Sequence, residues 1–322
     1  MTAPAPRAPS APRTVALWAV LATLAGSGMA LQSRVNGELG QQLRDGMLAA
    51  FLSFAVGLVL LLVIAACSPA MRRGLARLWS VLRSGELPWW FVTTGLMGAC
   101  FVAAQGLAAG VIGVALFTVG VVAGQTISSL AVDRMGIGGL PPKAITVQRV
   151  AGAVLALAAV TIAVLDRGGT PSWLLVLPFV AGLLQALQQA LGGVVQRASG
   201  SALAQAFSNF VVGTAALAII VAVQHLAGQH AEPLPTNPAL YIGGALGVAV
   251  IALGSVAVHH LGVLTLGLAL ICGQVLASLV LDLVWPVPGG GVTVASFAAA
   301  ALTIAAVAVS AMRRERRATP PA

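Results

Sequence analysis

Two ten-residue segments set amide, hydroxyl and carboxylate groups into otherwise apolar runs. The first, GQTISSLAVD, covers residues 124–133, and the second, GQVLASLVLD, covers residues 273–282. Gly, Gln, Ser, Leu and Asp occupy the same places in both segments. The chemistry open to these groups is hydrogen bonding and proton exchange, which is how polar residues inside membranes act on solutes and ions.

In a helix, each segment would place one Gln, one Ser and one Asp on a single face, because residues four apart differ by only about 40° in direction. The two sets are Gln125, Ser129 and Asp133, and Gln274, Ser278 and Asp282. Polar groups in hydrocarbon need partners, so these faces should turn toward other helices or a wet cavity. We therefore predict that both glutamines and both serines line a substrate pathway. Two alternatives stay open: the side chains only join helices, or the serines bond to their own helix.

The two aspartates of these segments have different surroundings. Asp133 is followed by Arg134, and we expect a solvated ion pair at the membrane edge. Asp282 lies among apolar residues, three positions before Trp285, and is the candidate for proton coupling. If Asp282 does not couple protons, a transporter of this sequence would act as a facilitator.

The composition indicates an all-α membrane protein. Of 322 residues, 59% are hydrophobic and only 8% are charged, which cannot supply a polar surface for a soluble protein of this length. The net charge of +9 comes from cations spread through short gaps between apolar runs, so a basic face for nucleic acid is not expected. The three cysteines lack C-x-x-C spacing, and no disulfide or metal site is implied.

The apolar runs are long enough for ten membrane-spanning helices, each of about 20 residues. We place them near residues 14–34, 46–67, 89–109, 112–132, 146–165, 173–195, 202–225, 239–258, 262–284 and 292–312. Most of the 17 Lys and Arg residues fall on one side of these spans, which predicts that both termini are cytoplasmic. The Pro/Ala-rich residues 1–13 should be a disordered tail, and residues 313–322 a basic cytoplasmic tail.

The sequence also repeats itself upstream of the two polar segments. At an offset of 156, Gly26, Gln32, Phe51, Phe54 and Gly57 match Gly182, Gln188, Phe207, Phe210 and Gly213. We infer two five-span repeats, residues 14–166 and 167–312, and an odd number of spans makes the second copy inverted. Such repeats are typical of transporters, whose site lies between the copies near the midplane. Gln32 and Gln188 are therefore candidate gate or cavity residues, or else amides at the water interface.

An enzymatic role is not expected. The sequence contains no Gly-x-Ser-x-Gly or His-Glu-x-x-His motif, which weakens the case for an intramembrane hydrolase. His259 and His260 are adjacent and would point about 100° apart on a helix, so they cannot ligate one metal from one face. We predict no cofactor and no metal.

Both halves resemble the YdcZ-type family of the drug/metabolite transporter (DMT) superfamily. The resemblance rests on an early G-x5-Q span, on F-x-x-F-x-x-G, on PWW before the third span and on the doubled GQ-x3-SL-x2-D segment, over about residues 15–312. The second half departs from the first, with Gly192 in the place of Asn36 and NPALYI in the place of PWWFV. The resemblance implies a ten-span protein of the bacterial inner (plasma) membrane that moves small metabolites or drugs outward.

We therefore expect an inner-membrane transporter, and an exporter by resemblance, that moves a small metabolite or drug-like molecule by alternating access. Its partners would be that small-molecule substrate and the lipid bilayer. The competing hypothesis is a membrane scaffold or assembly subunit that transports nothing. Substrate identity, proton coupling and oligomeric state stay open at this stage.

Overall fold

The computed structural model describes residues 12–137, 142, 144–166, 172–287 and 291–312, and within these ranges every regular element is a helix. The elements are α1 (Pro12–Leu43), α2 (Gly46–Cys67), α3 (Pro69–Arg83), η1 (Trp89–Thr94), α4 (Gly95–Ala104), η2 (Gln105–Ala109), α5 (Gly110–Ile112), α6 (Val114–Met135), α7 (Val147–Leu165), α8 (Ser172–Ser199), α9 (Ala202–Leu226), η3 (Pro238–Tyr241), α10 (Gly243–Val284) and α11 (Val294–Ala311). The predicted tails lie outside the described residues, except that α1 already begins at Pro12.

The helices begin where short polar side chains satisfy their first backbone N–H groups. Asp45 accepts hydrogen bonds from Met47 and Leu48 at the start of α2. Ser68, Thr146, Ser201 and Thr293 cap α3, α7, α9 and α11 in the same way. The polar residues between the apolar runs therefore act as N-caps, which are worth about 1 kcal/mol each.

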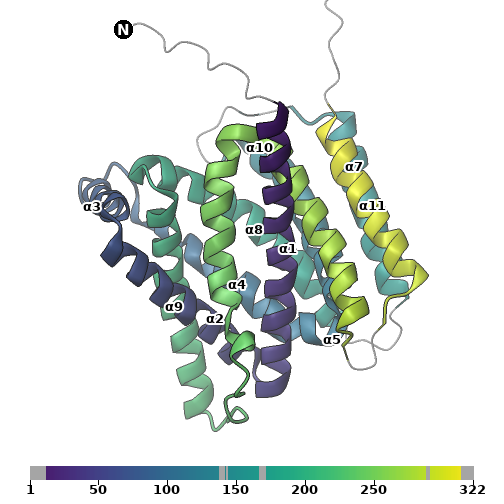
Figure 1. Cartoon of the computed structure of the whole chain (residues 1–322), viewed down its shortest axis with the longest axis horizontal. Helices are drawn as coiled ribbons and strands as arrows, with labels where there is room; N and C mark the ends of the chain where they lie inside the picture. Colours follow the sequence, from purple (N-terminus) through teal and green to yellow (C-terminus); the bar gives the residue numbers. More distant parts are fainter. Residues whose placement is uncertain (1–11, 138–141, 143, 167–171, 288–290, 313–322) are drawn as a thin grey trace, which may run out of the picture.

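Nine helices in the described part of the chain are long and apolar enough to cross a membrane, and they match nine of the ten predicted spans. The tenth, predicted at 239–258, corresponds to the shorter apolar stretch Gly243–Gly254. This stretch and the span Thr265–Val284 belong to one continuous element, α10, of 42 residues. A straight helix of that length would measure about 63 Å, twice the thickness of a bilayer core. Figure 1 shows α10 instead as two limbs on either side of α1.

Glycines allow α1 to cross the second limb of α10 at backbone distance. A Cβ at Gly26 would overlap the carbonyl of Leu270, and a Cβ at Gly273 would overlap the carbonyl of Thr23. Small residues at crossings let membrane helices pack closely, since no hydrophobic effect pulls helices together in lipid.

The crossing of α6 and α8 repeats these contacts. A Cβ at Gly182 would overlap the carbonyl of Val121, and a Cβ at Gly124 would overlap the carbonyl of Phe179. Each of these four residues stands 149 or 156 positions from its equivalent in the crossing of α1 and α10, so the two crossings are built from equivalent residues.

Helices α2 and α9 meet through the F-x-x-F-x-x-G motifs. The ring of Phe54 packs on Gly213, and the ring of Phe210 packs on Gly57. The two rings contact each other with centroids 4.8 Å apart. The second phenylalanine of each motif thus packs on the glycine of the other motif, although the two motifs are 156 residues apart in the sequence.

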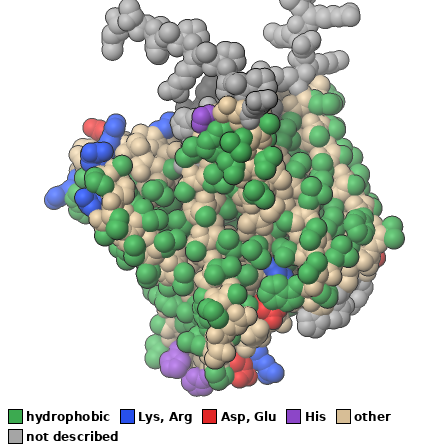
Figure 2. All heavy atoms as spheres, viewed as in Figure 1, with side chains coloured by type: hydrophobic (Ala, Val, Ile, Leu, Met, Phe, Trp, Pro, Cys, Tyr) green, Lys and Arg blue, Asp and Glu red, His purple; other side chains and the backbone are tan. Residues whose placement is uncertain are grey.

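The ends of the bundle carry its charges, while its sides are apolar. Arg72, Arg73 and Arg77 are exposed on α3, whose Met71 and Leu78 are buried against the bundle. Figure 2 shows these basic side chains gathered at the upper left, over the position of α3 in Figure 1. Figure 1 places the first turn of α1 and the last turn of α11 at this same end of the bundle.

Candidate functional site

A cavity of about 320 Å³ lies inside the bundle, among α1, α2, α4, α8, α9 and α10. Its described lining consists of Met29, Gln32, Ser53, Phe54, Gly98, Phe101, Val102, Gln185, Gln188, Gln189, Gly192, Gly193, Gln196, Gln205, Asn209, Phe210, Gly244, Gly247, Val250, Ile251 and Leu270. The volume is at the lower end of the range for small-molecule sites, about 300–1,000 Å³.

The polar part of the described cavity lining consists largely of amide groups. Helix α8 contributes Gln185, Gln188, Gln189 and Gln196, whose spacings of three, four, seven and eight residues place them on one face. Helix α9 adds two more amides, Gln205 and Asn209. Between the glutamines, Gly192 and Gly193 carry no side chain that would fill the space.

The rest of the described lining is largely apolar. Phe101 and Val102 of α4 face the cavity together with Val250, Ile251 and Leu270 of α10. A ligand bound here would meet both hydrogen-bonding groups and hydrocarbon, which is the usual composition of a small-molecule site.

Gln32 and Gln188, predicted as an equivalent pair, both line this cavity. A Cβ at Gly98 would lie 2.7 Å from the Gln188 Nε2 atom, and a Cβ at Gly247 would lie 3.4 Å from the Gln32 Nε2 atom. Gly98 and Gly247 are themselves equivalent at the 149-residue offset. Each amide therefore packs against a glycine of the other half of the chain.

Gln125 and Gln274 occupy equivalent positions with different partners. Gln125 donates a hydrogen bond from its Nε2 to the Oε1 of Gln185, which lines the cavity. Gln274 is 2% exposed, and its Nε2 has no hydrogen-bond partner among the described residues. The position equivalent to Gln185 in the first half is Met29, which offers no amide oxygen. Neither Gln125 nor Gln274 is among the residues that line the cavity.

This difference predicts that replacing each of the two glutamines by leucine changes the stability of the protein by different amounts. Gln125→Leu should lower the midpoint of thermal unfolding, because it leaves the oxygen of Gln185 without its partner at a cost of about 1–3 kcal/mol. Gln274→Leu should leave the midpoint unchanged or raise it, because it removes an amide whose nitrogen is already unpaired. Thermal unfolding of the two purified variants in the same detergent measures the difference. An equal or larger loss for Gln274→Leu would contradict this assignment.

The two serines of the repeated segments bond to their own helices. The hydroxyl of Ser129 donates to the carbonyl of Thr126, and that of Ser278 donates to the carbonyl of Val275. Neither residue is among the cavity-lining residues. Both serines thus bond to a carbonyl of their own helix, which is one of the alternatives to lining a pathway.

Asp282 caps a helix that is far away in the sequence. The chain breaks between α5 and α6 at Gly113, whose φ of +86° favours glycine. The carboxylate of Asp282 accepts hydrogen bonds from the next two N–H groups, Val114 at 2.9 Å and Ala115 at 2.8 Å. With Asp282 only 5% exposed, these bonds satisfy donors that would otherwise be unpaired at the positive end of α6.

A buried cation lies near this cap. Arg34 of α1 forms an ion pair with Glu38 at 3.3 Å and stacks over the ring of Trp285, with its Cζ 4.5 Å from the ring centroid. Its Nη2 also donates to the carbonyl of Pro286 at 3.4 Å. These contacts tie α1 to the end of α10 beside Asp282.

Substituting Asp282 distinguishes between two roles of this residue, a cap of helix α6 and a carrier of the coupled proton. Asp282→Asn should lower the unfolding midpoint by the equivalent of about 1–2 kcal/mol, because the amide group replaces one acceptor with a donor facing an N–H. Asp166→Asn is the control, since Asp166 is an exposed acceptor for the hydroxyl of Thr293. Transport by Asp282→Asn that still follows a pH gradient would remove Asp282 as the coupling residue. An unchanged unfolding midpoint would contradict its role as a cap.

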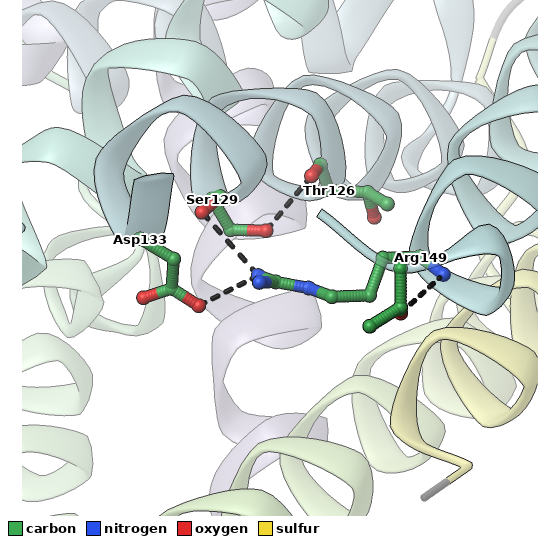
Figure 3. A network of polar contacts seen from close by, with 5 residues as sticks. Thr126, Ser129, Asp133 and Arg149 are labelled. Carbon is green, nitrogen blue, oxygen red and sulfur yellow. Dashed lines mark hydrogen bonds and ion pairs between the residues drawn. The ribbon is translucent and has the colours of Figure 1, made fainter. Parts of the chain in front are cut away.

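Asp133 forms its described ion pair with a residue that the sequence did not indicate. We expected Arg134, but the carboxylate contacts Arg149 of α7, with 2.6 Å between Asp133 Oδ2 and Arg149 Nη2. Figure 3 shows the guanidinium of Arg149 reaching between Asp133 and the backbone of Ser129, to whose carbonyl it donates at 3.4 Å. The pair joins α6 to α7 at the edge of the bundle.

A second polar network is fully buried and was not foreseen. Asn36 of α1 donates to the Oε1 of Gln105 at 2.7 Å, and Gln105 donates to the hydroxyl of Ser33 at 2.9 Å. Gln105 opens the π-helical element η2, where the widened turn leaves room for its side chain. The network ties α1 to the third predicted span.

Sequence reasoning named two of the cavity's seven amide residues as site candidates, Gln32 and Gln188. Gln185 and Gln189 were visible as neighbours of Gln188 on one helical face, and Gln196 continues that face one further heptad on. Gln205 stands four residues before Asn209 on α9, so these two amides also share a helix face, but neither has an amide at the equivalent position of the first half.

Comparisons with known proteins agree with this architecture. The family model described as "Putative inner membrane exporter, YdcZ" matches residues 17–162 and 173–309. No curated protein matches the chain. A solved structure named only "Crystal structure of protein" is similar with a TM-score of 0.51 and 19% identity, over 93% of this chain and 96% of that chain, which is a likeness of fold alone. With the family model matching each half in turn, the chain belongs to the YdcZ family of the drug/metabolite transporters, whose members are multi-span proteins of the inner membrane.

Proposed function

We propose that this protein exports a small metabolite or drug-like molecule by alternating access between two inverted five-span repeats. Helix α10 would then supply two spans, the limbs that lie on either side of α1 in Figure 1, which gives ten spans in all. Residues 14–166 and 167–312 form the repeats. The substrate would bind in the cavity lined by Gln32 and Gln188.

The paired contacts between helices support the inverted repeat. Gly26 with Leu270 and Gly182 with Val121 are equivalent contacts, and so are Gly57 with Phe210 and Gly213 with Phe54. In every case the residue of one repeat meets a residue of the other. An axis in the membrane plane that exchanges the two copies would produce this pattern.

The observation that carries the transport proposal is the position of the cavity. Its lining comes from both repeats, and the equivalent glutamines Gln32 and Gln188 reach into it from α1 and α8. Transporters built from inverted repeats bind substrate at this interface, because rocking one repeat against the other opens the site to each side in turn.

The charges support an orientation with both termini in the cytoplasm. The arginines of α3 and the ends of α1 and α11 lie at one end of the bundle. Cytoplasmic segments carry the excess of Lys and Arg. The cavity lining runs along α8 as far as Gln196, near the turn that follows Ser199, so this conformation would face the cytoplasm. A C-terminal reporter found on the outer face would contradict this orientation.

Metabolite profiling tests the export function. Cells that express the full chain should hold less of at least one small compound than cells without the gene, and their medium should hold more. A non-transporting scaffold predicts the same profile in both. Compounds that respond in this way become the substrates for the variants below.

A further inference from the structure

The described part of the cavity wall is polar without being charged. Among the described lining residues there is no Asp, Glu, Lys, Arg or His, although the chain contains 25 residues of the first four types, 17 basic and 8 acidic. A described cation that approaches the lining is Arg197, whose Nη1 lies 3.4 Å from the position of a Cβ on Gly193. Arg197 is exposed at the end of α8 and is not among the described lining residues.

Among the described residues, most amides of the cavity wall form no side-chain hydrogen bond within the protein. The oxygens of Gln185 and Asn209 accept hydrogen bonds from Gln125 and Thr94. Within the described chain, the remaining five amides, those of Gln32, Gln188, Gln189, Gln196 and Gln205, have no such side-chain partner. Each offers two N–H donors and an oxygen with two lone pairs. A ligand that enters must replace the water on these groups with donors and acceptors of its own, since unpaired polar groups are costly.

The same wall disfavours ions. A cation or anion enclosed among amides and hydrocarbon would lose its hydration without gaining a counter-charge, which is unfavourable in a medium of low polarity. An uncharged molecule with carbonyl, amide or hydroxyl groups would exchange one set of hydrogen bonds for another. Its apolar part would contact apolar lining residues such as Phe101, Val102 and Ile251.

We propose that this cavity selects solutes that are uncharged at neutral pH and that combine several hydrogen-bonding groups with an apolar surface. A cavity volume of about 320 Å³ suits a small solute. The amides of α8, Gln188 among them, would bind the polar groups of that solute. This inference rests on the proposed export function, and it adds the chemical class of the substrate.

The charge state of the exported compounds tests the inference. The compounds that change between cells with and without the full chain are expected to be uncharged at pH 7. If carboxylates, phosphates or permanent cations are the compounds that respond, the inference is wrong while export stands. If no compound responds, export itself is contradicted, and the inference falls with it.

Export by a variant with a charge introduced into the cavity wall tests the inference independently. Gln188→Glu should reduce export of the responding uncharged compounds at least about tenfold, because ionisation adds an unpaired charge beside the solute. Gln188→Asn should retain part of the export, since it keeps the amide. Gln229→Glu, in the exposed loop after α9, should export like the unchanged protein.

Size-exclusion profiles of the purified variants check that each is folded. Should Gln188→Glu not fold, Gln196→Glu, which is half-buried nearer the end of α8, takes its place. Full export of the uncharged compounds by a folded glutamate variant would overturn the inference.

Discussion

Gly273→Ala should prevent the chain from forming a stable folded protein, although it adds a single methyl group. The new Cβ would overlap the backbone carbonyl of Thr23 in the neighbouring helix α1. A side chain can rotate away from such a clash, but a backbone carbonyl moves only with its whole helix. We expect a loss of more than about 3 kcal/mol, above the usual range for overpacking. The yield of monodisperse protein and its unfolding midpoint measure the loss.

The same helix provides the control. A Cβ at Gly267, six residues earlier in α10, would meet nothing within 4 Å. Gly267→Ala should therefore leave stability unchanged or raise it by up to about 1 kcal/mol, because alanine favours the helix more than glycine does. Gly124→Ala, the equivalent of Gly273→Ala at the other crossing, should be as damaging, since its Cβ would overlap the carbonyl of Phe179. Equal behaviour of the Gly267 and Gly273 variants would contradict the close crossing of α1 and α10.

Gly247→Leu should abolish transport while leaving the protein folded. Gly247 lines the cavity, and the nearest atom to a Cβ there is Gln32 Nε2 at 3.4 Å, so a first carbon fits and a leucine would extend into the space that the substrate needs. Filling part of a cavity of about 320 Å³ with a branched side chain removes room for a ligand. We expect export of the responding compounds to fall at least about a hundredfold, equivalent to about 2.7 kcal/mol of lost binding.

Gly254→Leu is the matched control for this variant. It stands seven residues further along α10, on nearly the same helix face, where a Cβ would meet nothing within 4 Å and which the described cavity does not reach. Its export should equal that of the unchanged protein. Normal export by a folded Gly247→Leu variant would show that the substrate does not pass through this cavity.

The sequence predicted the parts of the fold that depend on local pattern or on recurrence. Nine of the ten predicted spans match helices of sufficient length, because hydrophobic length determines them. The recurring glycines mark close helix crossings, and the recurring pair Gln32 and Gln188 lines the cavity. Residues that recur at equivalent positions can be identified in this way because both repeats keep the residues that form the contacts between them.

Residues that differ between the repeats were harder to find, and the cavity depends on them. At the 156-residue offset, Gln185, Gln189, Gln196 and Gln205 correspond to Met29, Ser33, Gly40 and Ala49. Six of the seven described amides in the lining thus come from the second half and one, Gln32, from the first, so a comparison of equivalent residues identifies Gln32 and Gln188 but not these four.

Contacts between distant helices were also beyond sequence reasoning. Asp282 was identified as an isolated acid, whereas its carboxylate meets the N–H groups that the break at Gly113 leaves unpaired 168 residues away. Likewise, Asp133 has the cation Arg134 as its neighbour in sequence, yet the structure brings Arg149 of α7 to it. Such partners follow from how helices pack, and pattern along one chain does not carry that information.

The accessibility of position 188 from each side of the membrane tests alternating access most directly. In a full chain with Cys67, Cys100 and Cys272 replaced by serine, a cysteine introduced as Gln188→Cys would be exposed to a water-soluble thiol reagent added to one face of sealed vesicles. Val59→Cys, on the exposed apolar side of α2, should react from neither face. Alternating access predicts that Gln188→Cys reacts from both faces and that an exported compound slows the reaction. Reaction from one face only, or from neither, would contradict it.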